Sequence, residues 1–179
     1  KTISSNRPFY YSFNNCTNLG GISFPELTTI GGSANSGFNY AFTSTKLKNV
    51  EFPKLTTLAA MSFYRAFGSC NDLESVSFPE ITTISESNTF QEAFGGCSKL
   101  TSVSFPKLTT ISGQGTFTSA FDRCTSLQPI TFPELTSLTN SSGSNFAETF
   151  NDCSNLSDIY FPKLTTITSS TVIGSTIQN

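Results

Sequence analysis

Apolar and polar positions follow one another along this chain in a pattern that returns six times. Each return is centred on the dipeptide Phe-Pro, and the spacings between successive dipeptides are 28, 26, 27, 27 and 29 residues. The shared pattern reads F-x-x-A-F-x-x-C-x-x-L-x-x-I-x-F-P-x-L-T-T-I, and all 18 phenylalanines fall on its three Phe positions. The pattern therefore predicts an array of six similar units that fills nearly the whole chain.

The fourth unit shows which elements the pattern predicts. Val103 and Phe105 alternate with Ser102 and Ser104, as in a short strand that buries one face. Pro106 has no amide donor and a fixed φ, so it ends this strand and turns the chain. The following L-T-T-I sequence predicts a second short extended or turning segment.

The first part of each unit is predicted to be one to two turns of helix. In the fourth unit, Phe90 and Phe94 are four residues apart with Ala93 between them, which would place both rings on one side of a helix. The polar residues 88–89 would cap its beginning, and the glycines 95–96 suit its end.

One such unit is too small to bury three Phe side chains and its aliphatic residues, but stacked units can do so. If like residues lie above one another at roughly the 4.8 Å strand spacing, the rings form continuous columns. The predicted fold class is α/β: one domain, 1–179, built as a solenoid of six coils with a parallel sheet of short strands on one face and short helices or turns on the other. The units are 9–37, 38–62, 63–89, 90–116, 117–145 and 146–170, and a tail over 171–179 is apolar enough to cover the last coil or add a strand.

The recurring run A-F-x-x-C-x-x-L-x-x-I-x-F-P resembles the BspA-like leucine-rich repeat, also called the Treponema pallidum type. The resemblance extends over essentially all six units. The chain departs from that family in having Phe before Pro, where Leu or Ile is commoner, and in units several residues longer. The resemblance implies a leucine-rich-repeat solenoid, a cell-surface or extracellular location, and a concave face formed by the strand residues that point away from the core.

That face supplies the candidate binding site. Its residues are Asn49, Glu51, Ser75, Ser77, Ser102, Ser104, Thr131, Asp158 and Tyr160. Most are small polar groups, which suit weak, multivalent contact with a protein or glycan. The most distinctive side chains are Asn49 and Glu51 near one end and Asp158 and Tyr160 near the other. The leading hypothesis is therefore an adhesion or binding module.

Charges after the Phe-Pro dipeptides alternate in sign from unit to unit. They are Glu26, Lys54, Glu80, Lys107, Glu134 and Lys163. In a stack in register, each charge would face opposite charges above and below it. Exposed pairs contribute less than about 1 kcal/mol each, so the column is expected to fix the register. Because the column begins with Glu and ends with Lys, a second copy could continue it, which motivates the alternative of a structural spacer or filament subunit stacked head to tail.

Hydroxyl pairs recur in the L-T-T-I part of the units. They are Thr28–Thr29, Thr56–Thr57, Thr82–Thr83, Thr109–Thr110, Thr136–Ser137 and Thr165–Thr166. Threonine favours extended backbone and can hydrogen-bond between coils, so a structural role is expected. A regular threonine array could also bind ice, although adjacent residues of a strand are expected to point to opposite faces.

Five cysteines share one repeat position, at which the second unit has Thr45. They are Cys16, Cys70, Cys97, Cys124 and Cys153. Side chains stacked in register point in parallel, which is poor disulfide geometry, and no Cys-x-x-Cys pair or His suggests a metal site. We expect buried free thiols at a tight turn. Asn15, Asn140 and Asn155 begin glycosylation sequons, and burial of Cys16 would argue against use of the first.

Composition and charge narrow the function. Only 12% of residues are charged, the net charge is -2 and there is no His, so we expect no binding to nucleic acid. No apolar run approaches the roughly 20 residues that cross a bilayer, so we expect no membrane insertion. The usual general base is absent, the acids are scattered, and no nucleotide motif occurs, so we expect neither enzyme activity nor a cofactor or metal. The chain begins with Lys1 and is expected to be cut from something longer.

Overall fold

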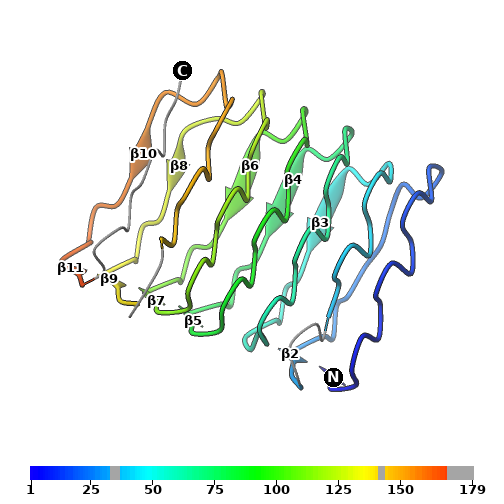
Figure 1. Ribbon diagram of the computed structural model, residues 1–179, viewed down its shortest axis with the longest axis horizontal. Helices are drawn as coiled ribbons and strands as arrows, with labels where there is room; N and C mark the ends of the chain where they lie inside the picture. The colour runs from blue at the N-terminus through cyan, green and yellow to red at the C-terminus, as the bar shows by residue number, and fades with distance from the viewer. Residues whose placement is uncertain (33–36, 141–143, 169–179) are drawn as a thin grey trace.

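The computed structural model describes residues 1–32, 37–140 and 144–168 (Figure 1). Its strands are β1 (Thr2–Ile3), β2 (Thr29–Ile30), β3 (Asn49–Glu51), β4 (Ser75–Ser77), β5 (Thr83–Ile84), β6 (Ser102–Ser104), β7 (Thr110–Ile111), β8 (Ile130–Thr131), β9 (Ser137–Leu138), β10 (Ile159–Tyr160) and β11 (Thr166–Ile167). The chain winds through six coils that lie side by side along the long axis of the molecule. The predicted solenoid with parallel strands is confirmed. The tail over 171–179 and the prediction made for it lie outside the described residues.

One wall of the solenoid, which we call the strand wall, carries β3, β4, β6, β8 and β10. β3, β4 and β6 pair in parallel, with Val50, Val76 and Val103 in register, and β10 pairs with β8 in a separate ladder. The ladder is interrupted between β6 and β8. Pro129 stands there at the position that Ser102 occupies one coil earlier, and it has no amide hydrogen to donate. The predicted single sheet is therefore two short ladders.

A second set of strands forms what we call the threonine edge. β5, β7, β9 and β11 pair in parallel from coil to coil, β1 pairs with β2, and a bridge joins Thr29 to Thr57. β2, β5, β7 and β9 each end in an aliphatic residue that is buried in the core, such as Ile84 and Ile111, which are at most 1% exposed. The L-T-T-I sequence therefore forms a strand and not only a turn.

The predicted short helices are wrong for the residues that the structure describes, none of which lies in a helix; nothing there is long and apolar enough to cross a membrane. The segment around Phe90 instead forms a third wall, the turn wall, built from overlapping turns. The amides of Phe90, Glu92 and Phe94 each donate to a carbonyl of the next coil at 2.9 Å. The amides between them donate three residues back within the coil, as Ala93 does to Phe90 at 3.1 Å. Every fourth residue has a left-handed backbone, with φ of 55° at Asn88 and 53° at Glu92.

Coil spacing explains why turns replace helices. The rings of successive coils lie 5.0–6.2 Å apart in all three phenylalanine columns, whereas a helix with its side chains is about 10 Å wide. Helices could stack beside these strands only if that side of the solenoid fanned open. The turn wall and the strand wall are both hydrogen-bonded from coil to coil, and successive coils lie side by side along the long axis (Figure 1).

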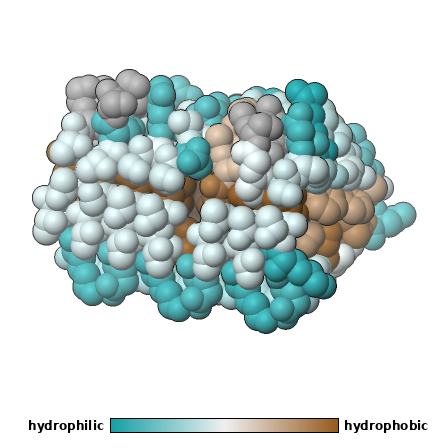
Figure 2. Space-filling model, turned by 90° about the horizontal axis from the view of Figure 1, so that it is seen from below, coloured by the Kyte–Doolittle hydropathy of each residue, from teal (hydrophilic) through white to brown (hydrophobic). Residues whose placement is uncertain are grey.

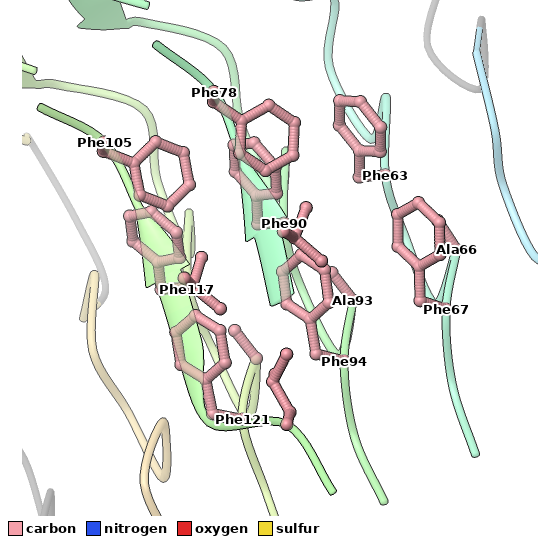
Figure 3. Packing of buried hydrophobic residues seen from close by; sticks show 14 of the residues in the cluster. Phe63, Ala66, Phe67, Phe78, Phe90, Ala93, Phe94, Phe105, Phe117 and Phe121 are labelled. Carbon is pink, nitrogen blue, oxygen red and sulfur yellow. The ribbon is translucent and has the colours of Figure 1, made fainter. Parts of the chain in front are cut away.

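The core is made of three phenylalanine columns (Figure 3). One column rises through Phe63, Phe90 and Phe117, whose successive rings are 5.1 and 5.4 Å apart and nearly parallel. Rings from the strand wall meet this column edge-on, as Phe78 does with Phe90 at 5.0 Å and 72°. Phe52, Phe78, Phe105 and Phe132 are all at most 2% exposed. The stacking prediction, on which the others depend, is confirmed.

Candidate functional site

The strand wall carries eight of the nine residues of the predicted binding face on β3, β4, β6, β8 and β10, and the ninth, Asp158, directly precedes β10. Their burial alternates with that of the core residues, so Asn49 and Glu51 are exposed on either side of buried Val50. Tyr160 is the most prominent, with 51% of its surface exposed. Ser75 donates a hydrogen bond to the Asn49 side chain at 2.6 Å, which links two coils. Three coils separate the Glu51 end from the Tyr160 end, so the distinctive residues do not form one cluster.

The charge column pairs differently from the prediction. Each Lys contacts the Glu of the preceding coil at 2.7 Å, in the pairs Lys54–Glu26, Lys107–Glu80 and Lys163–Glu134. Within the part of the chain that the structure describes, no ion pair joins Lys54 to Glu80 or Lys107 to Glu134. The prediction of opposite partners both above and below is therefore wrong, because each ammonium group turns toward one neighbour.

The hydroxyls of the threonine edge bond between coils, as expected. Thr56 donates to the carbonyl of Thr28 at 3.2 Å, and Thr109 donates to that of Thr82 at 3.0 Å. The prediction that paired threonines face opposite ways is wrong: the Thr56 and Thr57 hydroxyls lie 3.5 Å apart, and both residues are exposed. The first Thr precedes the strand, so strand alternation does not apply to it. Figure 2 shows the molecule from this side, with mostly pale or hydrophilic atoms; hydrophobic atoms show between them across the middle and toward the right of the view.

Four of the five thiols are buried and free, as predicted, but Cys16 is exposed. Each buried thiol donates to a Phe carbonyl one coil earlier, as Cys97 does to Phe67 at 3.0 Å. Burial raises the pKa of the Cys97 and Cys124 thiols, and raises that of Cys153 to about 11. The prediction of burial is wrong for Cys16: among the described residues, coil 1 packs against another coil on one side only. The argument against glycosylation at Asn15 therefore loses its basis.

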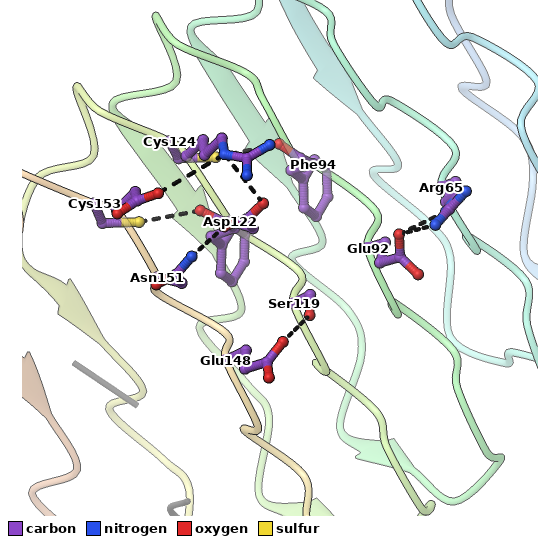
Figure 4. A network of polar contacts seen from close by, with 12 residues as sticks. Arg65, Glu92, Phe94, Ser119, Asp122, Cys124, Glu148, Asn151 and Cys153 are labelled. Carbon is purple, nitrogen blue, oxygen red and sulfur yellow. Dashed lines mark hydrogen bonds and ion pairs between the residues drawn. The ribbon is translucent and has the colours of Figure 1, made fainter. Parts of the chain in front are cut away.

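The turn wall carries a groove that sequence reasoning missed. It has a volume of about 480 Å³ and runs from Tyr40 in coil 2 to Asn151 in coil 6. Polar pairs line it (Figure 4): Arg65 forms an ion pair with Glu92, Asn151 donates to Asp122 at 2.8 Å, and Ser119 donates to Glu148 at 3.5 Å. Arg123 lies 3.8 Å from both Asp122 and Asp152.

Glycines open this groove. Gly68 and Gly95 occupy a repeat position at which other coils have Thr43, Asp122 and Asn151. A Cβ atom on either glycine would meet no atom closer than 3.7 Å, and neither has a positive φ. The backbone would therefore accept a side chain at both positions. Packing therefore does not require glycine at these two positions. The effect of the glycines is to leave the groove unfilled.

Tyrosines cluster at the coil-2 end of the groove. Tyr11 stacks on Tyr40 with ring centroids 4.5 Å apart and planes within 9°. Tyr40 meets Tyr64 edge-on at 5.3 Å, and the Arg65 guanidinium lies 5.7 Å from the Tyr40 centroid. Partial burial raises the pKa of Tyr64 to about 12. Tyr10 and Tyr11 stay 40% and 44% exposed.

A sequence signal for this site existed. Four of the five tyrosines lie at two adjacent repeat positions in the first three units, while all phenylalanines lie at core positions. The hydroxyl group of tyrosine prefers contact with water, so the placement of Tyr and Phe at different repeat positions indicates an exposed aromatic surface. The predicted helix gave no indication that this aromatic surface adjoins a groove, which Tyr40 lines.

The comparison with protein families identifies the type of repeat. The family described as the BspA type leucine rich repeat region matches residues 9–92 and 65–179, with six copies. The crystal structure of the T. pallidum leucine-rich repeat protein TpLRR is similar with a TM-score of 0.32 and 22% identity, covering 65% of this chain and 72% of that chain. A leucine-rich cell surface protein from Faecalibacterium prausnitzii A2-165 has a TM-score of 0.25 and 17% identity, covering 85% of this chain and 62% of its own. No curated protein matches the sequence significantly.

Proposed function

This chain belongs to the BspA-type leucine-rich repeat family, and on that premise we propose that it is a non-enzymatic binding module of a surface or secreted protein. The coils use nearly all their large apolar side chains for the shared core. What remains outside is a set of regular polar walls on a rigid frame. Such a surface suits the recognition of a protein or glycan on another cell or matrix.

The observation that carries this proposal is the order of the strand wall. Outward side chains of β3, β4 and β6 are held in parallel register, with Asn49 opposite Ser75 and Ser75 opposite Ser102. Their backbone groups already bond to one another, so the side chains alone are available to a partner. Glu51 and Tyr160, at the two ends, are the largest exposed side chains among the candidate residues of this wall, larger than Asn49 and Asp158.

Binding of labelled protein to arrays of matrix proteins and glycans tests the proposal. We expect Glu51→Ala together with Tyr160→Ala to weaken any binding by at least about tenfold, because aromatic and charged anchors dominate polar interfaces. Asn49→Ala and Asp158→Ala should have smaller effects. Binding that survives all four changes would remove the strand wall from the proposal, and antibody staining of intact cells would test the surface location separately.

Head-to-tail stacking is a second candidate. The first coil leaves Phe9, Phe13 and Phe24 partly buried, beside an end pocket of about 260 Å³ that includes Ile3. At the other end of the described residues, Ile167 is 51% exposed. A second copy that covered these side chains would extend the core. Light scattering decides this candidate, since a protein that stays monomeric at high concentration does not stack in this way.

Ice binding remains the most distant proposal. No residue of the threonine pairs is buried, but Thr56, Thr109 and Thr136 of the first column donate to carbonyls of the preceding coil. Absence of thermal hysteresis in a dilute solution of the protein would exclude it.

A further inference from the structure

We propose that the groove on the turn wall binds a neutral linear oligosaccharide, with the tyrosine cluster stacking against a sugar ring at the coil-2 end. The proposal goes beyond the strand-wall function, because it assigns a ligand to a different wall. It is based on the charges that line the groove, the state of its backbone groups and the placement of its tyrosines.

Charge balance in the groove favours a neutral ligand. The lining holds two arginines against Glu92, Asp122 and Glu148, and the two arginines are already engaged: Arg65 with Glu92, and Arg123 with Asp122 and Asp152. A strongly anionic or cationic chain would have to break these pairs to find a partner. Hydroxyl groups can instead donate to the remaining carboxylate lone pairs and accept from the guanidinium and amide groups without separating the pairs.

Backbone satisfaction argues against an extended peptide. Peptides that dock as an added strand need a row of free amides and carbonyls. On the turn wall these groups are consumed, because alternate amides bond to the next coil and the others close turns, as Glu92 and Ala93 illustrate. A ligand in this groove can therefore form hydrogen bonds only with side chains. Because these side chains lie along the whole groove, the ligand needs hydrogen-bonding groups along its whole length, such as the hydroxyls of a glycan.

The tyrosines supply the apolar contact that a glycan needs. The axial C–H groups of a sugar ring pack on aromatic faces, and the phenol group next to them offers a hydrogen bond. Tyr40 lines the groove, and Tyr11 stacks on it and extends the aromatic surface toward the first coil. Arg65 braces the cluster, because it lies over both Tyr40 and Tyr64 while paired with Glu92.

The dimensions fit a short linear chain. The groove spans five coils, which at the roughly 4.8 Å strand spacing gives a length of about 20 Å. This is near the length of a linear tetrasaccharide. Gly68, Gly95 and Gly96 keep its middle open, so the ligand would lie along the solenoid axis.

Intrinsic tyrosine fluorescence gives a direct test, because the chain has no Trp and four of its five Tyr lie in this cluster. The probes are cellotetraose, chitotetraose and mannotetraose, with a heparin-derived tetrasaccharide as the anionic comparison and a proline-rich octapeptide as the peptide comparison. We expect at least one neutral probe to bind with a Kd below about 1 mM, confirmed by calorimetry.

Two variants locate the binding. Gly68→Asn with Gly95→Asn should fill the groove and abolish binding, and folding should persist because Asn151 holds the same position in coil 6. Tyr11→Ala should weaken binding by at least about tenfold. Ser104→Asn on the strand wall is the matched control and should leave the affinity unchanged.

Three results would overturn the proposal: no neutral probe binds, the heparin fragment or the peptide binds more tightly than every neutral probe, or the filled-groove variant binds as the wild type does. Its failure is distinguishable from failure of the strand-wall function, since the Glu51 and Tyr160 variants leave this groove intact.

Discussion

Coil 1 and coil 4 carry the same repeat pattern, yet they bury its residues to different extents. In coil 4, Phe90 is 0% exposed and Cys97 is 0% exposed. In coil 1, the corresponding Phe9 is only partly buried and Cys16 is exposed. The repeat pattern determines which side chains face inward, while the adjacent coils on both sides determine how completely those side chains are shielded from solvent. Burial in this fold belongs to pairs of coils and not to single units.

Removing one phenylalanine ring should reveal the largest difference in stability between the two coils. Phe90→Ala should cost about 3–5 kcal/mol of unfolding free energy, because the ring is enclosed by Phe63, Phe78, Phe105 and Phe117. Phe9→Ala, the matched change in coil 1, should cost less than about 2 kcal/mol, since its ring is already partly wet. Urea unfolding measures both. Equal losses would contradict the view that burial depends on two neighbours.

The reaction rates of the cysteines should also differ between coil 1 and the later coils. We expect Cys16 to react with a disulfide reagent at pH 8 at least about 100-fold faster than the four buried cysteines, because these require an opening of the coils. A buried thiol that reacted as fast as Cys16 would refute this.

Raised thiol pKa values also link stability to pH. The folded protein holds Cys153 protonated up to a pKa of about 11, against an ordinary value of 9.0. Its contribution is therefore fully present below about pH 9 and is lost as the pH rises toward 11. Cys153→Thr should remove this part of the alkaline loss, since Thr45 holds the same position in coil 2.

The smallest effect is expected from the charge column. Lys107→Ala should cost less than about 0.5 kcal/mol, because the Lys107 and Glu80 side chains are 54% and 41% exposed and water screens the pair. Lys54→Ala near coil 1 should cost about the same, because a surface pair gains nothing from a central position. Unfolding in low and high salt measures both, and a loss above about 1 kcal/mol would overturn this expectation.

Much of this architecture could be predicted from residue spacing. Val103, Phe105 and Pro106 predict a strand, its inward face and its end, and the recurrence of Phe predicts the columns. The turn wall could not be predicted in the same way. Phe90, Phe94 and Cys97 fit a helical face, and the left-handed positions hold residues as unlike as Tyr40, Arg65 and Glu92, so local sequence does not mark them. Only the coil spacing, a long-range property, excludes the helix.

The candidate sites show the same division. The outward residues of the strand wall followed from alternation; eight of the nine lie on its strands, and Asp158 directly precedes β10. The groove did not follow, because it arises where Gly68 and Gly95 lack what other coils carry. A missing side chain indicates a groove only when the repeats are aligned with one another and the backbone of the turn wall is known.

The backbone hydrogen bonds that join coils along the turn wall run one way, from the amide of one coil to the carbonyl of the next, as in Phe63 to Thr89 and Phe90 to Thr116. Every coil thus has an accepting flank and a donating flank, so excision of a single unit leaves two flanks that can still join. The Glu–Lys pairs group coils in twos. Gain or loss of a single repeat by recombination therefore keeps the backbone hydrogen bonds between coils. Only gain or loss of two repeats at a time also keeps every Lys beside a Glu.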